Sequence, residues 1–144
     1  MKSLDQIGVE RGTDKSSLNH CYLSFYELLF EKWRFKPIRI LEIGVQFGNS
    51  IRTWKEYFPN AEVVGIDSVD NGVQLPGILI ANAYEPDAQE RILGNFDIII
   101  DDGSHLEEHQ RYFVFAYQQR LYNEGILIVE DETLVAMGLF SGPE

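Results

Sequence analysis

Short apolar runs alternate along this chain with stretches whose apolar residues recur at helical spacing. The runs predict five strands, at residues 38–43, 63–66, 78–81, 96–100 and 126–129. The helical spacing predicts helices at residues 50–58, 85–93 and 105 or 106 to 122. Strands that are apolar almost throughout and that alternate with helices are typical of an α/β fold with a parallel sheet covered on both faces.

A further helix is expected before the first strand. An apolar stripe at helical spacing begins near residue 16 or 17 and continues to residue 37, whereas residues 1–15 are mixed and polar. His20, Tyr22 and Tyr26 lie in this stripe and could contact a ligand. An aromatic stripe of this kind more often packs in the core, which is the preferred interpretation.

The stretch at residues 38–50 organises the rest of the pattern. Its apolar strand ends at Gly44, and Gly48 leads into the next helix. Glycines at such a turn let a ligand approach the backbone, and the free N–H groups of the helix's first turn would face that ligand. Glu42 lies at the end of the strand, where an α/β sheet places its ligand crevice. Because many glycines only close a tight bend, the turn alone is a weak signal.

Asp67 strengthens this signal, because it ends the second predicted strand 19 residues after Gly48. At about this spacing, an acidic residue in nucleotide-binding folds accepts hydrogen bonds from ribose hydroxyls. An aspartate at a strand end is also a common turn residue. The combination of glycine turn and acid favours the ribose role.

Polar side chains follow the strands so consistently that a solvated surface is a poor explanation. The strands are followed or ended by Glu42, Asp67, Asn82, Asp101, Asp102, Glu130 and Asp131. We interpret them as a nucleoside site near the first three strands and a cation site at the last two. Crowded carboxylates repel one another less if they share a divalent cation, and oxygen ligands favour Mg²⁺, with Ca²⁺ or Mn²⁺ as alternatives. The competing interpretation is that Asp101 caps the next helix and that Glu130 and Asp131 are exposed.

Composition limits the possible partners. The 144 residues suffice for one domain, and a net charge of -11 argues against nucleic acid or an anionic membrane as a partner. Cys21 is the only cysteine, and we expect it to be a small buried residue of the first helix rather than a nucleophile. No apolar run approaches the length of a membrane span or a signal peptide, so a cytoplasmic protein is expected.

Several motifs together resemble the class I S-adenosylmethionine-dependent methyltransferases. They are Leu-Glu-Ile-Gly-Val at 41–45, Gly-Asn-Ser at 48–50, Gly-Ile-Asp at 65–67, Asp-Asp-Gly-Ser-His at 101–105 and Val-Glu-Asp at 129–131. The likeness is greatest to metal-dependent macrolide sugar O-methyltransferases of the mycinamicin and demethylmacrocin type, which Gly-Thr-Asp-Lys at 12–15 also resembles. It implies a Rossmann-like, doubly wound sheet of strand order 3-2-1-4-5. One domain would span 1–144, with an N-terminal helical segment (1–37), a cofactor-binding core (38–131) and a short tail (132–144).

The resemblance also implies roles for individual residues. The S-adenosylmethionine site would comprise Glu42, Gly44, Gly48 and Ser50 around the methionine part, Asp67 at the ribose, Asn82 and Ala83 at the adenine edge, and also Ser68 and Asp101. Many relatives have Asp where this chain has Asn82. Asp102, Glu130 and Asp131 would hold Mg²⁺ or another divalent cation, with Asp102 and His105 as catalytic residues. His105 could instead be a water-exposed residue at a helix N-terminus.

The implied reaction is methyl transfer to a hydroxyl group of a small-molecule acceptor. The cation would bind the acceptor oxygen and lower its pKa, and His105 would take the proton as that oxygen attacks the sulfonium methyl group. Two other functions stay open. One is an S-adenosylmethionine-binding module without turnover, and the other is a nicotinamide-dependent oxidoreductase, although the glycine turn lacks the third glycine of the dinucleotide fingerprint.

The chain departs from the family after Asp131, where 13 residues replace a helix and the last two family strands. The strand at 126–129 would then be an uncovered sheet edge, which folded proteins avoid. Because residues 133–140 are mainly apolar, we predict that the tail folds back over this strand or docks on a second copy, giving a homodimer.

Overall fold

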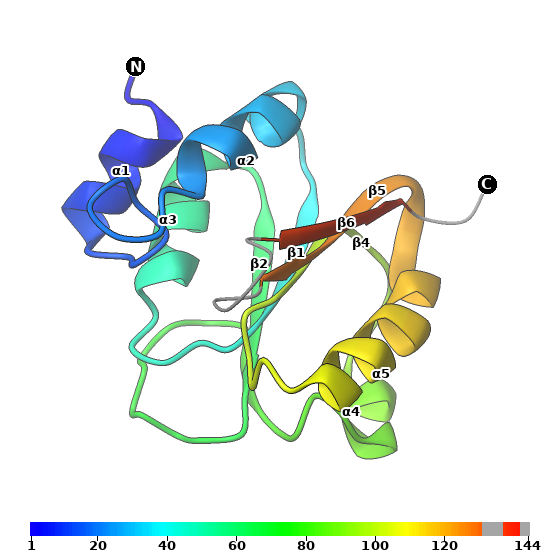
Figure 1. Cartoon of the computed structure of the whole chain (residues 1–144). Helices are drawn as coiled ribbons and strands as arrows, with labels where there is room; N and C mark the ends of the chain where they lie inside the picture. Colours follow the sequence, from blue (N-terminus) through cyan, green and yellow to red (C-terminus); the bar gives the residue numbers. More distant parts are fainter. Residues whose placement is uncertain (131–136, 142–144) are drawn as a thin grey trace.

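One twisted sheet of six strands forms the centre of the molecule (Figure 1). The computed structural model describes residues 1–130 and, for their backbone alone, residues 137–141. The strand order is β3-β2-β1-β4-β5-β6. The strands are β1 (Arg39–Ile43), β2 (Glu62–Asp67), β3 (Ile78–Ile80), β4 (Phe96–Asp101), β5 (Leu121–Glu130) and β6 (Met137–Ser141).

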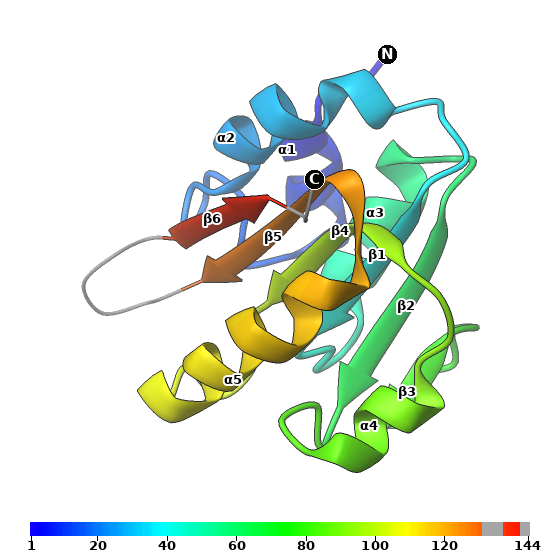
Figure 2. The ribbon, with the colours of Figure 1, turned by 90° about the vertical axis from the view of Figure 1, so that its right-hand side faces the viewer.

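The first five strands are parallel in the predicted order, which confirms the expected fold class. The prediction is wrong in one respect, because β6 adds a sixth strand. It pairs antiparallel with β5, from Ile126 opposite Ser141 to Glu130 opposite Met137 (Figure 2). The backbone of the tail therefore provides hydrogen-bond partners for the outer edge of β5. This confirms the prediction that the tail folds back over this strand. The homodimer stays a prediction.

Helices cover both faces of the sheet. They are α1 (Leu4–Arg11), α2 (Leu23–Phe30), α3 (Asn49–Tyr57), α4 (Pro86–Arg91) and α5 (Glu107–Tyr117), with short 3₁₀ turns at η1 (Glu31–Trp33) and η2 (Gln118–Arg120). Figure 1 shows α1, α2 and α3 on one face and α4 and α5 on the other. Side chains alternate between the two cores, since Ile98 and Ile100 pack in the first cluster and Ile99 in the second. This arrangement explains why the strands are apolar at consecutive positions.

The N-terminal part departs most from the prediction. Residues 4–11, for which no helix was expected, form α1 behind a capping box between Ser3 and Gln6. The next helix begins at Leu23 rather than at residue 16 or 17. Residues 16–22 form turns instead, and the Lys15 carbonyl accepts hydrogen bonds from the N–H groups of Tyr22 and Leu23.

These turns also change the expected position of Cys21. The residue is exposed, has a left-handed φ of 61° and precedes the helix, so the prediction of a buried helical cysteine is wrong. Tyr22 and Tyr26 are buried in the core, as the preferred interpretation held, but for His20, which is exposed, that interpretation is wrong. Leu18 is exposed, because the turn carries it away from the helical stripe.

The sequence also predicted the end of α5 too far along the chain, at residue 122. The helix ends at Tyr117, a 3₁₀ turn follows, and β5 begins at Leu121 rather than Ile126. Arg120 holds this turn by donating to the carbonyl oxygens of Gln89 and Ile92. Leu121 can then pair with Phe96 on β4, and a register shift separates this contact from the ladder that begins at Ile98.

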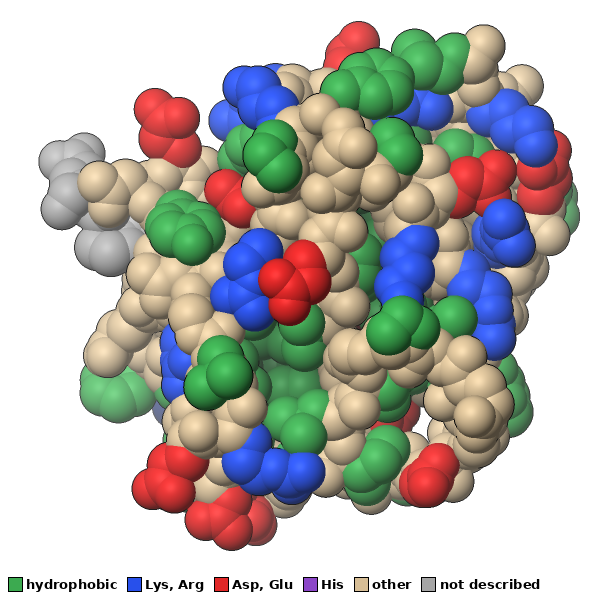
Figure 3. Space-filling view, turned by 180° about the vertical axis from the view of Figure 1, so that it is seen from behind, with side chains coloured by type: hydrophobic (Ala, Val, Ile, Leu, Met, Phe, Trp, Pro, Cys, Tyr) green, Lys and Arg blue, Asp and Glu red, His purple; other side chains and the backbone are tan. Residues whose placement is uncertain are grey.

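The outer surface carries charges of both signs. Figure 3 shows lysine and arginine side chains among acidic and hydrophobic ones, so the net charge of -11 does not make this face uniformly acidic. In the described part of the chain, every helix is too short or too polar to cross a membrane.

The role of β6 can be tested by truncation. A chain ending at residue 132 should have a lower free energy of unfolding and should self-associate, because the edge of β5 loses its backbone partner. Urea denaturation and light scattering would measure the two effects. A chain ending at Ser141, which keeps β6, is the control, and the full chain in the same light-scattering series tests the predicted homodimer. A 132-residue chain that is monomeric and as stable as the control would contradict this role.

Candidate functional site

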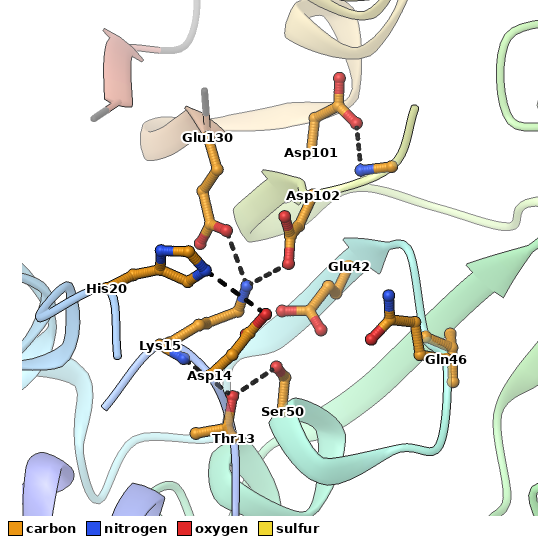
Figure 4. Close-up of polar contacts among 12 residues, drawn as sticks. Thr13, Asp14, Lys15, His20, Glu42, Gln46, Ser50, Asp101, Asp102 and Glu130 are labelled. Atoms are coloured by element: carbon orange, nitrogen blue, oxygen red, sulfur yellow. Dashed lines mark hydrogen bonds and ion pairs between the residues drawn. The ribbon is translucent and has the colours of Figure 1, made fainter. Parts of the chain in front are cut away.

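Acidic side chains from three strands meet at the carboxyl edge of the sheet (Figure 4). Glu42 comes from β1, Asp101 and Asp102 lie at the end of β4, and Glu130 ends β5. β4 pairs with β1 on one side and with β5 on the other, so these ends are adjacent. The structure thus brings together most of the acids that the sequence placed at strand ends.

A buried lysine lies among these acids. The Lys15 side chain is fully buried, and its Nζ donates to Asp102 Oδ2 at 2.6 Å and to Glu130 Oε2 at 2.7 Å (Figure 4). Burial lowers the pKa of Lys15, but the surrounding carboxylates outweigh this effect and hold it well above its ordinary value. The surrounding carboxylates therefore favour the ammonium form of Lys15.

From the sequence, Lys15 was interpreted only as part of a polar turn that resembles a family motif. The available signal was the charge balance, since several carboxylates at one sheet edge need a cation from within the chain or from solution. Nothing local in the sequence links Lys15 to partners 87 and 115 residues away.

Glu130 is almost completely buried, and both of its carboxylate oxygens have partners. Oε2 accepts from Lys15, and Oε1 accepts from the hydroxyl of Tyr26 on α2. Burial raises the pKa of Glu130, and the ammonium of Lys15 opposes this effect. The interpretation of Glu130 as an exposed surface residue is therefore wrong.

Glu42 is also fully buried, but it is only half satisfied. The indole Nε1 of Trp54 donates to Oε2 at 2.8 Å, whereas Oε1 has no hydrogen-bond partner among the described residues. Burial raises the pKa of Glu42 from an ordinary 4.5 to about 7, although Lys15 favours the ionised form. We call Asp102 and Glu130, which share Lys15, the acid cluster. The free oxygen of Glu42 is a hydrogen-bond acceptor beside this cluster.

His105 lies next to the same cluster. Its Nδ1 is 3.0 Å from the Glu130 carbonyl oxygen, and its Nε2 is 3.4 Å from Asp102 Oδ1. The residue has a left-handed φ of 61°, is partly buried and precedes α5, so it is not a water-exposed residue of the helix N-terminus. Its ring lies between the Glu130 carbonyl oxygen and the Asp102 carboxylate.

The glycine turn has a structural cause. Gly44 has a φ of 93°, and a Cβ there would lie 2.1 Å from the Asp102 carbonyl oxygen, so only glycine lets the ends of β1 and β4 pack together. Asp67 fixes the turn from the other side, because its Oδ2 accepts from the N–H groups of Val45 and Gln46 at 2.9 and 2.8 Å. Gly48, with a φ of 85°, is the N-cap of α3.

Of the cavities beside this turn, two are lined by Asp102. The larger, of about 310 Å³, is lined by Asp67, Ser68, Asn82 and Ala83 of the predicted cofactor site and also by Gly44, which was predicted to lie at the methionine part. The smaller, of about 100 Å³, is lined by Gly44 and Ser50 together with Thr13 and Asp14 of the N-terminal segment. Both cavities share Gly44, Gln46 and Asp102. Gly48, Glu42 and Asp101, which were predicted to bind the cofactor, line neither of these two cavities.

Asp101 supports the wall of the larger cavity. It is buried, and its Oδ1 accepts from the Tyr84 hydroxyl at 2.6 Å and from the Gly103 N–H at 3.1 Å. Burial raises its pKa. Asp101 does not cap α5, whose N-cap residue is Leu106, so the capping interpretation is wrong.

Sequence reasoning also missed an aromatic pair at this cavity. The rings of Tyr84 and His109 stack with centroids 4.2 Å apart, and Ser104 Oγ lies 2.6 Å from His109 Nδ1. All three residues line the larger cavity. Tyr84 and His109 come from a loop and from a helix, so no local sequence pattern joins them.

The acid cluster has the chemistry of a cation site. Two carboxylates on adjacent strands already share one positive group, the ammonium of Lys15. Within residues 1–130, no three or more His, Cys, Asp or Glu side chains are arranged to hold a metal ion. The third predicted ligand, Asp131, lies outside the described residues, so the predicted set of three stays untested.

The substitution Glu42→Gln should remove a pH-dependent loss of stability. The unfolded carboxyl ionises near pH 4.5 but the folded one near pH 7, so its stabilising effect is present below pH 4.5 and is lost as the pH rises through 7. The unfolding free energy of the wild type should fall by about 3 kcal/mol relative to the variant over this range. Urea denaturation from about pH 4 to about pH 8 measures it. Parallel pH profiles for both proteins would contradict a buried, raised Glu42.

Comparison with known proteins identifies relatives of this chain, although no family model matches. The chain is 30% identical over 141 residues to 8-demethyl-8-(2-methoxy-alpha-L-rhamnosyl)-tetracenomycin-C 3'-O-methyltransferase of Streptomyces olivaceus, covering 89% of this chain and 36% of that protein. It is 31% identical to mycinamicin VI 2''-O-methyltransferase of Micromonospora griseorubida, covering 89% of this chain and 35% of that protein. The chain thus spans little more than a third of either relative.

The solved structures agree with this result. The methyltransferase MycE of mycinamycin biosynthesis, in complex with Mg, SAH and mycinamycin VI, superposes with a TM-score of 0.83 at 30% identity. The match covers 90% of this chain and 39% of MycE. A protein-L-isoaspartate O-methyltransferase from Plasmodium falciparum shares the fold, with a TM-score of 0.59 at 16% identity. These findings confirm the resemblance stated from the sequence and the class I methyltransferase fold.

Proposed function

We propose that this chain, which has the class I methyltransferase fold and is similar over most of its length to one region of the sugar O-methyltransferases, binds S-adenosylmethionine and transfers its methyl group to a hydroxyl of a small molecule or sugar. One observation carries the proposal. The two cavities at the glycine turn meet at Asp102, where the acid cluster and His105 also lie. Cofactor and acceptor would therefore meet where a charged, proton-accepting group is available.

The cavities suit the two ends of the cofactor. The larger would take the nucleoside, with Asp67 and Ser68 at the ribose and Asn82 and Ala83 at the adenine edge. The smaller would take the methionine part, against Ser50 and the N-terminal segment. Because three hydrogen bonds already fix Asp67, to the N–H groups of residues 45, 46 and 69, its carboxylate is oriented before any ligand binds.

Asp102 and Glu130, together with Asp131, would hold a divalent cation. Their oxygen donors suit Mg²⁺, and the bound cation would supply positive charge that lowers the pKa of the acceptor hydroxyl and fixes its position. The Lys15 ammonium supports this assignment, because it lies between two of these carboxylates and pairs with both.

His105 would accept the proton of the acceptor hydroxyl. A carbonyl oxygen can only accept a hydrogen bond, so the contact with the Glu130 carbonyl places the proton on Nδ1 and leaves Nε2 as the basic nitrogen. Nε2 is also the nitrogen near Asp102 Oδ1. The imidazolium formed by proton uptake would be stabilised by that carboxylate.

A binding module without turnover is the second candidate function. The observation that favours it is that, among the residues that the structure describes, no three or more His, Cys, Asp or Glu side chains are arranged to hold a metal ion. The two relatives named above are matched over 36% and 35% of their length. Both relatives are O-methyltransferases, which favours adenosylmethionine over a nicotinamide cofactor.

The single cysteine suits a reducing, cytoplasmic setting, which stays a proposal.

The substitution His105→Gln should separate turnover from cofactor binding. Loss of a general base typically lowers the rate by about 10²–10⁴-fold, whereas S-adenosylhomocysteine should bind with nearly unchanged affinity because His105 lines neither cavity. Mass spectrometry of methyl transfer to simple diols and deoxysugars with Mg²⁺ measures the first effect, and calorimetry measures the second.

Glu124→Gln is the control, since Glu124 is exposed near the start of β5, at the opposite end of that strand from Glu130. Methyl transfer that persists in EDTA would contradict the metal-assisted mechanism. A chain that binds S-adenosylhomocysteine but methylates no acceptor would favour the binding module.

The substitution Asp67→Ala should weaken S-adenosylhomocysteine binding by roughly 1.5–3 kcal/mol, through loss of the ribose contact and of the bonds that hold the turn. Asp70→Asn is the control, because Asp70 is an exposed loop residue whose Oδ1 accepts from the Gly72 N–H. Calorimetry with the two variants makes the comparison. Equal affinities, or binding of NAD in place of S-adenosylhomocysteine, would overturn the nucleoside-site assignment.

A further inference from the structure

Every carboxylate oxygen of Asp102 and Glu130 faces a group of the protein. In Asp102, Oδ2 accepts from Lys15 and Oδ1 lies 3.4 Å from His105 Nε2. In Glu130, Oε2 accepts from Lys15 and Oε1 accepts from Tyr26. These two acids are the described members of the proposed cation site, yet neither has an oxygen without a neighbour.

The position between the two carboxylates is filled by the ammonium of Lys15. Its Nζ lies 2.6 and 2.7 Å from one oxygen of each acid, and its side chain is fully buried (Figure 4). Mg²⁺ binds oxygen ligands at about 2.0–2.1 Å, so a cation joining the same two oxygens would need the place that Nζ now holds. The remaining Glu130 oxygen faces Tyr26, which is itself fully buried in the core.

We propose that Lys15 is the resident counter-ion of Asp102 and Glu130 and competes with the divalent cation for these carboxylates. This inference rests on the cation site of the proposed function. A cation would bind only after the ammonium has left at least Glu130, so Lys15 would lower the affinity of the site and keep its acids neutralised when no cation is present.

The structure also provides a second position for the displaced ammonium. Glu42 lies beside Lys15, and its Oε1 is buried without a hydrogen-bond partner among the described residues (Figure 4). The backbone of Lys15 is held by hydrogen bonds from Tyr22 and Leu23 to its carbonyl oxygen. A change in side-chain torsions, with the backbone fixed, would therefore transfer the ammonium from Glu130 towards Glu42.

An alternative role for Lys15 predicts the opposite effect. If the lysine only held the two carboxylates in a geometry suited to the metal, its removal would weaken cation binding. If the lysine competes, its removal should strengthen cation binding, because the carboxylates lose their internal partner. The sign of the change in affinity distinguishes the two roles.

The test is the Mn²⁺ affinity of the full chain and of Lys15→Met, measured by electron paramagnetic resonance of free Mn²⁺ without cofactor or acceptor. Methionine keeps an unbranched side chain but removes the charge. We expect Lys15→Met to bind Mn²⁺ at least about tenfold more tightly than the wild type. Lys36→Met is the matched control, because Lys36 is exposed, and its affinity should equal that of the wild type. Unchanged or weaker binding by Lys15→Met would overturn the proposal.

A second measurement uses the wild type, so it does not depend on the folding of a variant with unpaired buried acids. In ¹⁵N-lysine-labelled protein, the buried ammonium of Lys15 should give a ζ-nitrogen signal protected from hydrogen exchange. Addition of Mg²⁺ should shift this signal, with the same midpoint as cation binding, as the hydrogen bonds to Asp102 and Glu130 are lost. A signal that stays unchanged at saturating Mg²⁺ would overturn the proposal.

The outcomes also separate this inference from the proposed function. If the wild type binds Mn²⁺ and Lys15→Met binds it no more tightly, the proposed competition by Lys15 is refuted. The metal-assisted mechanism is then unaffected. If only Lys15→Met binds Mn²⁺, the competition is supported and metal dependence of the natural chain is refuted. If neither protein binds Mn²⁺, both are refuted.

Discussion

The arrangement of the site depends on the burial of one ammonium ion among carboxylates at the carboxyl edge of the sheet. Glu42, Asp102 and Glu130 belong to three different strands, and two of them are fully or almost fully buried. Buried acids of this kind are costly unless a positive group compensates them. Lys15 provides that charge, and it thereby ties the N-terminal turn to the ends of β4 and β5. The sheet edge and the N-terminal segment are therefore held together by the same ion pairs that compensate the buried acids.

The shape of the two cavities at the glycine turn follows largely from constraints of the fold itself. Gly44 is required because the backbone of Asp102 occupies the space of a Cβ, and Asp67 is oriented by the amides of the turn that it closes. The cavities on either side of the turn thus follow from the backbone geometry of the chain. Preorganisation of this kind reduces the entropic cost of binding, because the turn and the carboxylate need not be ordered when the cofactor arrives.

The outer edge of β5 is paired by another strand of the same chain. The chain corresponds to little more than a third of its relatives, and its parallel sheet ends at β5. The antiparallel β6 pairs with the whole apolar part of that strand, from Ile126 to Glu130. The two side-chain clusters on the faces of the sheet are covered by α1 to α3 and by α4 and α5. A backbone ladder and two helical layers therefore enclose the core around which the site is built.

The sequence by itself determined the parallel strands, their order through the family resemblance, and the convergence of Glu42, Asp102 and Glu130. These features follow from local hydrophobic patterns and from strand direction, since parallel strands deliver their carboxyl ends to one edge. Only the tertiary structure decided that Lys15 neutralises two of these acids, that Asp67 closes the glycine turn and that Tyr84 stacks on His109. The turns at residues 16–22, and with them the exposure of Cys21, also depend on packing, because the aromatic stripe alone indicated a continuous helix. Contacts between residues far apart in the chain leave no periodic trace in the sequence, so the lysine that completes the site could be found only in the folded molecule.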